Sequence, residues 1–493
     1  MAHGAAYLVC GLAFGDEGKG SVTDFLVRAH AARAVVRFNG GPQAGHNVVA
    51  PDGRWHCFAQ FGAGSFVPGT RTLLGPQMLV EPENLAVEAD VLRAKGVGDA
   101  LARLVIDPDC AVVTPMHKMI GQMLEIARGR RAVGSCGMGV GQAILDRERR
   151  AGVRVRDILV GRAGARRLEE LAREKLAQAA ELVQTHPSEE MRAAHRYFLA
   201  RCRSVDLLRS YRGILASPGI AVVRAASELR REIARGAVVF EGAQGALLDG
   251  RLGFFPYVTR SRTTAHDAVD LLEAARARTS ARVRIGVLRA YGHRHGPGPF
   301  VTEDGRLARR FDDPRNCTNR WQGRFRVGRL DLVALRYGLR LNRGVDWLAV
   351  TGLDRLTGLP GVRVCASYEY HGDRAELDPY FEWEPLRGGK ARILGIRVPA
   401  TPAPPAPHPG PAGREPDHSR TRVLLRCRPL EWIELPGWRR DVRGARSPAD
   451  LPAAARGFVE FLESARGLGV PVGLVSVRPD AGGKLVFPAS DVP

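Results

Sequence analysis

The chain has 493 residues, of which 45% are hydrophobic, and a formal net charge of +21. This length exceeds one minimal core, so one large domain with insertions or several lobes is expected. No apolar run approaches the roughly 18 to 20 residues that cross a bilayer, which excludes a membrane-spanning protein. The basic balance attracts nucleic acids or phosphorylated small molecules, but arginine enrichment also follows from codon composition, so charge alone assigns no partner.

The predicted elements alternate between strands and helices from the N-terminus onward. Residues 1–9 have no basic segment ahead of their apolar stretch, so we expect a first strand there and no signal peptide. A helix is predicted over residues 22–32 and a second strand over 34–38. Further buried strands are predicted over residues 237–241, 283–287, 347–351 and 472–476. This order predicts an α/β fold with a central, mostly parallel sheet flanked by helices.

Two stretches depart from the α/β pattern. Residues 166–235 are rich in Arg, Glu, Ala and Leu, with apolar positions at helical spacing, and predict a helical lobe. Residues 399–416 include TPAPPAPHPGPAG, which predicts an exposed, extended loop, either a passive insertion or a polyproline ligand. We therefore expect a nucleotide-binding core over 1–384, a Pro-rich insertion over 385–425, and a C-terminal part of the core over 426–493.

The eight cysteines are scattered along the chain, and none forms a CxxC pair. Disulfide frameworks and zinc sites usually show clustered cysteines. The simpler interpretation is free thiols in a reducing cytosol, which predicts a cytoplasmic protein.

The first glycine-rich loop, residues 15–21, reads GDEGKGS between a predicted strand and a helix. Glycines let the backbone approach phosphate oxygens, the helix N-terminus adds donors, and Lys19 adds a full charge. This resembles a P-loop, so the predicted fold is P-loop-NTPase-like, although Ala13 and Gly20 replace two residues of the Walker pattern. An acidic pair inside a phosphate loop makes Asp16 a candidate magnesium ligand and general base, with a plain tight turn as the alternative.

The second glycine-rich loop, residues 39–47, reads NGGPQAGHN directly after a strand. A single histidine such as His46 is more often structural, but its pairing with the first loop favours a ligand site. GDEGKG followed about twenty-five residues later by GGxxAGH resembles the adenylosuccinate synthetase family. Similar blocks follow in the same order at residues 137–141, 239–245, 257–259, 298–303, 331–337 and 475–480.

The resemblance implies a GTP- and magnesium-dependent ligase of purine nucleotide biosynthesis that condenses IMP with aspartate. The six-position oxygen of IMP is a poor leaving group, so the family phosphorylates it and then displaces phosphate with the amine. Asp16 would remove the N1 proton, His46 would act as an acid on the transferring phosphoryl group, and Gln244 would bond the base or its phosphorylated intermediate. The task is positioning and charge stabilisation.

The resemblance also implies the substrate contacts. The residues implied for GTP are Gly15, Glu17, Gly18, Lys19, Gly20, Gly45, His46, Asp354 and Ser476. Those implied for IMP are Gln43, Cys136, Arg150, Gln244, Thr259 and Arg324. Those implied for the amino acid are Trp321, Gln322, Arg324 and Arg326, and those for magnesium are Asp16 and the Gly45 carbonyl. Ordinary loop capping is the alternative for Gln244 and Thr259, and a helix N-cap is the alternative for Asp354.

Arg150 matches an arginine that, in the family, reaches across a dimer interface to the partner's nucleotide. This match implies a homodimer with shared sites, unless Arg150 is only one member of the basic surface run at residues 147–150. No membrane contact and no nucleic-acid partner are expected.

The amino-acid loop departs most from the family pattern. Residues 320–328 read RWQGRFRVG where the family has TTGRxRR. Arg324 and Arg326 remain, and guanidinium groups suit carboxylates, which favours an anionic amine donor. Because Trp321 and Gln322 replace two threonines, the donor could be aspartate held differently, another amino acid, or a larger amine packed on Trp321.

Other departures leave three functional hypotheses open. Cys136 lacks a hydroxyl expected near the nucleotide phosphate, and Met138 replaces an arginine. Gly352 replaces a lysine that stacks on guanine in the family, so the preference for GTP or ATP as phosphoryl donor stays undecided. The chain is then an adenylosuccinate synthetase, a diverged ligase with the same phosphoryl-activation step, or an inactive GTP- or nucleic-acid-binding paralogue.

Overall fold

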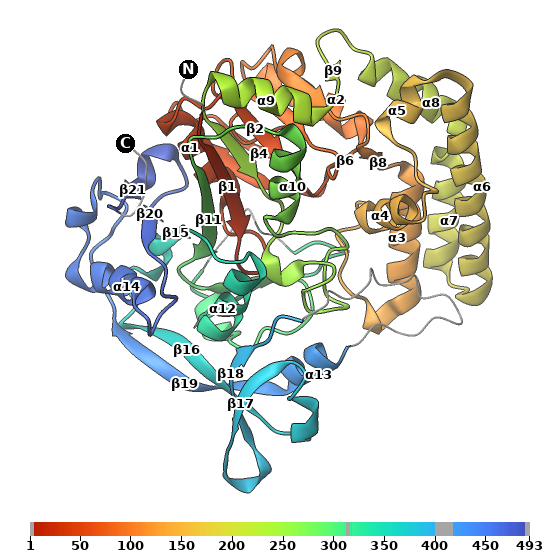
Figure 1. The fold of residues 1–493 in the computed structure, drawn as a ribbon. Helices are drawn as coiled ribbons and strands as arrows, with labels where there is room; N and C mark the ends of the chain where they lie inside the picture. Colours follow the sequence, from red (N-terminus) through yellow and green to blue (C-terminus); the bar gives the residue numbers. More distant parts are fainter. Residues whose placement is uncertain (1–3, 312–315, 317, 400–417, 489–493) are drawn as a thin grey trace.

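A ten-stranded sheet forms the centre of the computed structural model, which describes residues 4–311, 316, 318–399 and 418–488. Its order is β21-β20-β15-β11-β1-β10-β2-β5-β7-β9 (Figure 1). All neighbours are parallel except β20 and β21. The strands are β1 (Ala6–Gly11), β2 (Ala34–Arg37), β5 (Arg71–Leu74), β7 (Leu104–Ile106), β9 (Ala221–Val222), β10 (Val238–Glu241), β11 (Arg282–Arg289), β15 (Trp347–Thr351), β20 (Val472–Ser476) and β21 (Lys484–Val486).

Helices cover both faces of this sheet, as a buried parallel sheet requires. Alternate residues of a strand point to opposite faces. Tyr7 and Val9 of β1 accordingly pack with one helix, while Leu8 and Cys10 pack with two others on the far side. These helices are α1 (Lys19–Ala29) on the first face and α9 (Ala225–Arg235) and α10 (His266–Ala275) on the second. The predicted α/β class is confirmed, and the helix expected over residues 22–32 begins three residues earlier, at Lys19.

The helical lobe stands beside the sheet (Figure 1), and its apolar core is continuous with residues of β5 and β7 at that end of the sheet. It consists of α3 (Pro115–Arg128), α5 (Val155–Leu159), α6 (Gly161–Thr185), α7 (Glu189–Arg201) and α8 (Ser204–Leu215). The range predicted for this lobe was 166–235, but the last part of that range, helix α9, does not belong to the lobe. Leu229 and Ile233 of α9 pack against the central sheet, because that helix is the amphipathic crossover between β9 and β10.

A second, smaller sheet lies below the central one in Figure 1. Helix α12 (Leu332–Leu341) packs on it through Val333, Ala334 and Tyr337. Its strands are β14 (Leu330–Asp331), β16 (Gly361–Tyr370), β17 (Phe381–Pro385), β18 (Ala391–Ile396) and β19 (Cys427–Pro436). The range 385–425 predicted as a Pro-rich insertion therefore contains β18 and most of α13 (Ser419–Arg426), while residues 400–417 lie outside the described part.

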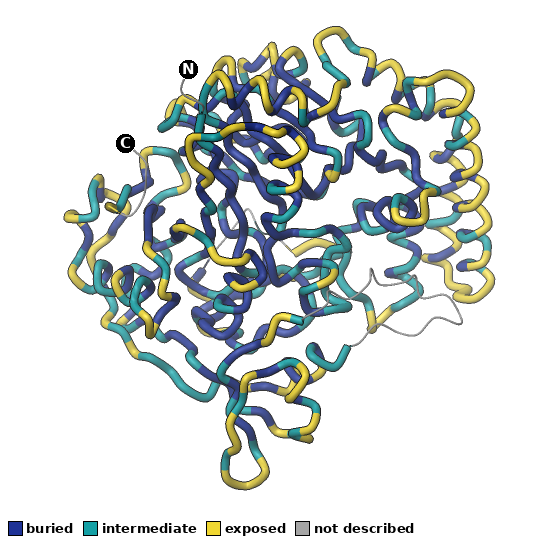
Figure 2. The backbone as a smooth tube through the Cα atoms, in the orientation of Figure 1, coloured by how far each residue is buried: buried dark blue, intermediate teal, exposed yellow. Residues whose placement is uncertain are grey.

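The remaining elements are short or peripheral. They are β3 (His46–Val49), β4 (Trp55–Phe58), β6 (Leu79–Val80), β8 (Ala111–Val112), β12 (Gly292–His295), β13 (Phe325–Gly328), α2 (Pro82–Ala94), α4 (Val140–Glu148), α11 (Gly305–Ala308) and α14 (Ala453–Glu463). Figure 2 shows that burial concentrates in the strands of the central sheet, whereas the outer faces of the lobe helices are exposed. Within the described ranges, none of the helices carries an apolar stretch long enough to cross a bilayer.

Candidate active site

One large cavity, of about 850 Å³, lies at the carboxyl ends of the central strands. In parallel α/β sheets this edge is where ligands bind, and the volume suits substrates of nucleotide size. The loops after β1, β2, β10, β15 and β20 all reach it. The predicted residues that line it are Gly15, Asp16, Glu17, Gly18, Lys19, Gly20, Gln43, Gly45, His46, Cys136, Gln244, Thr259, Gln322, Asp354 and Ser476.

Glu17 organises the first loop from inside. Its buried carboxylate accepts hydrogen bonds from the backbone amides of Ala13 and Gly15, both at 3.0 Å, and pairs with Lys19 Nζ at 2.5 Å. Burial acts to raise the pKa of Glu17, but the charges of Lys19 and His293 and the hydrogen bonds from Lys19 and the Ala13 amide together outweigh burial, and the net shift is downward. Glu17 therefore stays ionised, closes the loop and holds the Lys19 cation beside it.

Asp16 presents its carboxylate to the cavity from a fixed backbone. Its φ of 54° lies in the left-handed region, which is costly for a residue other than glycine. Two side chains hold this conformation: Arg289 Nε donates to the Asp16 carbonyl at 2.6 Å, and His293 donates to the Gly15 carbonyl. The Asp16 side chain is 34% exposed, and its carboxylate accepts no hydrogen bond from any described residue. It is thus available to a ligand or a metal ion.

His46 forms a buried pair with Glu241. Its Nδ1 lies 2.6 Å from Glu241 Oε1, while Oε2 accepts from the Ala63 amide at 3.0 Å and lies 3.8 Å from Arg37 Nε. Burial lowers the pKa of His46, and the Glu241 carboxylate partly opposes that shift. Burial acts to raise the pKa of Glu241, but His46 and Arg37 outweigh it, so the net shift is downward. The pair fixes the imidazole and leaves its Nε2 for a ligand.

Three chain turns meet at this point. A Cβ atom at Gly20 would lie 2.8 Å from His46 Cβ, so the first and second loops touch and only glycine fits between them. A Cβ at Gly15 would lie 3.4 Å from Gln244 Cα, which brings in the turn after β10. Gln244 itself has a left-handed backbone, with φ 58°. Asp16, His46 and Gln244, which are far apart in the sequence, therefore share one cavity.

The far end of the cavity carries Asp354 and Ser476. Burial raises the pKa of Asp354, and Arg355 partly opposes the shift. The N-cap position of the short 3₁₀ helix Leu353–Leu356 is Gly352, with φ 70°, so the alternative of a helix N-cap at Asp354 is wrong. Asp354 is instead a cavity carboxylate.

The amino-acid loop is arranged differently from the expectation. Arg324 and Arg326 do not line the cavity; both pair with Glu303, at 2.9 and 2.5 Å, and Arg326 also donates to the carbonyls of Gly296 and Gly298. These contacts hold the Arg326 guanidinium against the chain just after β12, whereas the Arg324 side chain remains exposed.

Trp321 and Arg150 also lie outside the lining of the cavity. A Cβ at Gly137 would lie 2.7 Å from Trp321 Cδ1, so the indole packs on the backbone of the loop that carries Cys136, and only Gln322 of the pair faces the cavity. Arg150 lines a separate pocket of about 320 Å³ together with four other arginines, Arg147, Arg154, Arg156 and Arg167.

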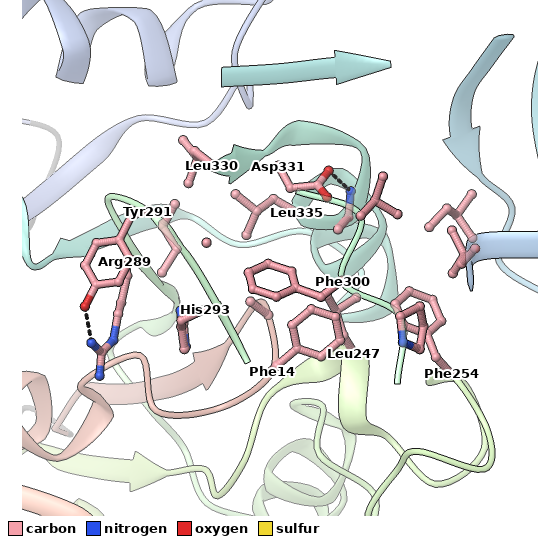
Figure 3. Close-up of a pocket in the computed structure, with 18 of the residues that line it drawn as sticks. Phe14, Leu247, Phe254, Arg289, Tyr291, His293, Phe300, Leu330, Asp331 and Leu335 are labelled. Carbon is pink, nitrogen blue, oxygen red and sulfur yellow. Dashed lines mark hydrogen bonds between the residues drawn. The ribbon is translucent and has the colours of Figure 1, made fainter. Parts of the chain in front are cut away.

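A small apolar cavity of about 40 Å³ lies behind the first loop. Figure 3 shows Phe14, Leu247, Phe254 and Phe300 gathered around it, with Arg289 bonded to Tyr291 at one side. At another side Asp331 accepts from the Ala334 amide at 3.1 Å (Figure 3). Its lining is mostly apolar, so this space is a packing gap that supports the loop and offers few groups to a polar substrate.

Sequence reasoning missed four residues that build the site. Glu241 ends a buried strand inside a block already matched to the family. Because a buried carboxylate is costly without an ion-pair or hydrogen-bond partner, this position signals a paired side chain nearby. Arg289 ends β11, and His293 and His295 lie on one face of β12 after a bend in the chain; all three side chains reach the first loop. The alternation of His293 and His295 was visible in the sequence, but the loop that their shared face contacts was not.

Comparisons with known proteins identify the family of the chain. The family model described as adenylosuccinate synthetase matches residues 8–386. Adenylosuccinate synthetase of Desulforudis audaxviator (strain MP104C) is 34% identical, over 98% of each chain, and that of Anaeromyxobacter sp. (strain K) is 32% identical, over 94% of each. The solved structure of fully ligated adenylosuccinate synthetase from Plasmodium falciparum, 20% identical, shares the fold with a TM-score of 0.74 over 98% of this chain and 99% of that one. This chain belongs to the adenylosuccinate synthetase family.

Proposed function

We propose that this chain is a ligase that makes adenylosuccinate from IMP and aspartate and converts GTP to GDP and phosphate. One observation supports it most directly: Asp16, His46 and Gln244 converge in a single cavity beside the glycine-rich loop. A carboxylate and an imidazole on separate turns supply the base and the acid that phosphoryl activation of a carbonyl oxygen requires.

The first step is the transfer of the terminal phosphoryl group. Asp16 takes the N1 proton of the hypoxanthine ring, and the six-position oxygen, now an anion, attacks the γ-phosphorus of GTP. The bond from this phosphorus to the oxygen shared with the β-phosphate breaks, and GDP leaves. His46 stabilises the charge on the transferring group through Nε2, because its Nδ1 is bound to Glu241. The approach of a phosphate dianion opposes the burial effect on the pKa of His46 and favours its protonated form.

The second step is displacement by the amine. The amine nitrogen attacks C6, the carbon–oxygen bond breaks, and phosphate leaves with the oxygen that was phosphorylated. The amine nitrogen loses one proton, which the departing phosphate can accept. Gln244, held by a left-handed backbone at the same turn, would bond the base or its phosphorylated form. Thr259 and Cys136 would lie beside the nucleotide phosphate, and Asp354 would accept hydrogen bonds from the N1 and amino groups of guanine.

The residues present fit a magnesium ion. Magnesium is usually bound by one or two protein carboxylates together with substrate phosphates and water, so a dense protein cluster is not required. The Asp16 carboxylate is open to the cavity, and the Gly45 backbone is exposed at its edge. When bound there, the ion would neutralise charge on the β- and γ-phosphates.

A diverged amine donor is the second candidate. It is favoured by the placement of Arg324 and Arg326 on Glu303 and of Trp321 on Gly137, which leaves Gln322 as the member of this set that faces the cavity. The donor would still be a small amine with at least one carboxylate if Arg324 can leave its ion pair with Glu303.

A phosphate-release assay tests the proposal. Purified chain with IMP, GTP, magnesium and aspartate should yield adenylosuccinate and GDP in equal amounts, and Asp16→Ala should remove both products. Phosphate release with IMP and GTP but with an amine other than aspartate would select the diverged ligase. No turnover with any amine in a panel of amino acids would reject both candidates.

A homodimer in the cytoplasm completes the proposal. Arg150 has a left-handed backbone, φ 59°, and lines an arginine-rich pocket away from its own cavity, as a residue that serves a partner subunit would. The described cysteines are free, which fits a reducing compartment. Mixing Arg150→Ala subunits with Asp16→Ala subunits should restore about a quarter of wild-type activity if sites are shared; no recovery would contradict sharing.

A further inference from the structure

His295 stands at the edge of the active-site cavity, next to Asp16. Its Nδ1 lies 3.9 Å from Asp16 Oδ2, and its side chain is 11% exposed. It ends strand β12, on the same face of the chain as His293, and its ring packs edge-on against Phe325, with 5.9 Å between the ring centroids. No step of the proposed reaction uses this side chain.

The hydrogen bonds of His295 settle which nitrogen carries the hydrogen. Nε2 lies 3.2 Å from the carbonyl oxygen of Gly323, and a carbonyl can only accept. Nε2 therefore donates, and in the neutral ring Nδ1 carries a lone pair. Nδ1 forms no hydrogen bond with a described residue. It and the Asp16 carboxylate are thus two acceptors, 3.9 Å apart, at the wall of one cavity.

Two neighbouring acceptors are best satisfied by a ligand that brings several N–H donors. On the proposed function, Asp16 acts at N1 of the purine, and the incoming amine attacks the adjacent carbon, C6. The amine nitrogen must then pass close to Asp16 and is the donor-rich group that enters this space. We propose that His295 Nδ1 accepts a hydrogen bond from the attacking amine and so positions it for attack; this rests on the proposed function.

The loop on the other side of His295 supports the same assignment. Gly323 closes a compact turn with Asn319, whose side-chain oxygen accepts from the Trp321 and Gln322 amides at 3.0 and 2.7 Å. Gln322 of this turn lines the cavity, whereas Arg324 and Arg326 are engaged with Glu303. The His295 ring thus lies between the turn at residues 319–323, which departs from the family pattern, and Asp16, the proposed general base.

Two substitutions separate the amine contact from a role in holding the turn. His295→Gln places an amide nitrogen near the Nε2 position, keeps a donor for the Gly323 carbonyl, and removes the cavity acceptor. His295→Asn places an amide oxygen near the Nδ1 position, keeps the cavity acceptor, and loses the bond to Gly323. Steady-state kinetics of the full-length chain would then be measured with IMP, GTP and aspartate, each varied in turn, beside thermal unfolding of each variant.

The proposed contact predicts that His295→Gln raises the KM for aspartate at least tenfold, with the KM values for IMP and GTP changed less than twofold. His295→Asn should raise the aspartate KM clearly less. An effect of His295→Asn equal to or larger than that of His295→Gln would overturn the proposal, because it would show that the ring only holds the turn. An unchanged aspartate KM in His295→Gln, or a parallel rise of all three KM values, would overturn it as well.

These outcomes are distinct from failure of the proposed function. A wild-type chain that forms no adenylosuccinate overturns both the proposed function and the contact that depends on it. A wild-type chain that does form it, together with a His295→Gln variant that uses aspartate normally, overturns the contact alone.

Discussion

The two sides of the cavity are built in contrasting ways. On the phosphoryl side, Glu17, Lys19, His46 and Glu241 are buried and are bonded to one another or to backbone amides. On the amine side, the turn at residues 319–323 is held by its own Asx contacts and by packing on Gly137. The phosphoryl side is therefore fixed by buried contacts, whereas the turn on the proposed amine side lies at the surface, where substitutions disturb the core less.

The largest expected effect comes from separating the two phosphoryl-side loops. Gly20→Ala would place a Cβ 2.8 Å from His46 Cβ and 3.0 Å from the His46 carbonyl carbon. The loops must move apart, and a displacement of about 1 Å at reacting groups costs about a hundredfold in rate. We expect kcat to fall by at least about that factor, measured by phosphate release with IMP, GTP and aspartate.

Gly213→Ala is the matched control for that change. Gly213 lies in helix α8, and its added Cβ would meet no atom within 4 Å. Alanine is the better helix former by about 1 kcal/mol, so this variant should be at least as stable as the wild type and fully active. A Gly20→Ala enzyme with near-normal kcat would show that the contact between the loops does not set the catalytic geometry.

The next effect comes from removing the carboxylate that orients His46. Glu241→Gln leaves Arg37 buried beside a neutral amide and loses the charge that favours protonated His46. We expect kcat to fall roughly tenfold to a hundredfold and the free energy of unfolding to fall by about 3 kcal/mol. Glu88→Gln, which also alters a buried carboxylate bonded to two backbone amides, should leave kcat intact.

The pH dependence of stability follows from the same pair. The pKa of Glu241 is lowered in the folded chain, so its stabilising effect is present above the unfolded value of about 4.3 and is lost as the pH falls through the folded value. Unfolding curves of the wild type and Glu241→Gln should therefore differ most near pH 7 and approach each other below about pH 4. If the free energies of unfolding of the two proteins differed by the same amount at every pH, the stability lost in Glu241→Gln would come from packing instead of charge.

Asp354 is expected to control the choice of base and to have a smaller effect. Its pKa is raised by burial, yet the carboxylate lines the cavity where guanine would present two N–H donors. Asp354→Asn should lower kcat/KM for GTP about tenfold to a hundredfold, the value of a charged hydrogen bond, and leave that for ATP nearly unchanged. Asp441→Asn, which alters a nearby exposed carboxylate, is the control and should leave the preference for GTP intact.

The sequence was sufficient where chemistry is local and ordered along the chain. The strand–loop–helix pattern at residues 7–32 predicted β1, the glycine-rich loop and α1, because hydrophobic period and glycine spacing are properties of a single segment. Of the blocks matched to the family, those at residues 137–141, 239–245, 257–259 and 475–480 contribute to the lining of the cavity, whereas those at 298–303 and 331–337 do not. The strands expected over residues 237–241 and 472–476 are β10 and β20 of the central sheet, which the structure confirms.

The sequence was insufficient where the partner of a side chain lies far away. Arg324 and Arg326 pair with Glu303, some twenty residues earlier, and a pattern of arginines contains no sign of which carboxylate they meet. Trp321 packs on Gly137 for the same reason: the fit depends on a missing side chain nearly two hundred positions away. Tertiary partners of this kind become visible only when both segments are placed.

The smallest effect expected on stability also tests the amine side most directly. The Arg324 side chain is 72% exposed and holds one ion pair, whereas that of Arg326 is 14% exposed and donates to Glu303 and two carbonyls. Arg324→Ala should change the free energy of unfolding by less than about 1 kcal/mol, and Arg326→Ala should lower it by about 2 kcal/mol or more.

Because Arg324 can leave its exposed pair at little cost, it is the arginine free to turn toward a carboxylate. Its loss should therefore raise the KM for aspartate at least severalfold while the KM for GTP stays constant. If aspartate KM does not respond to Arg324→Ala, the carboxylate is bound by other cavity groups and the amine side has diverged in mechanism as well as in sequence.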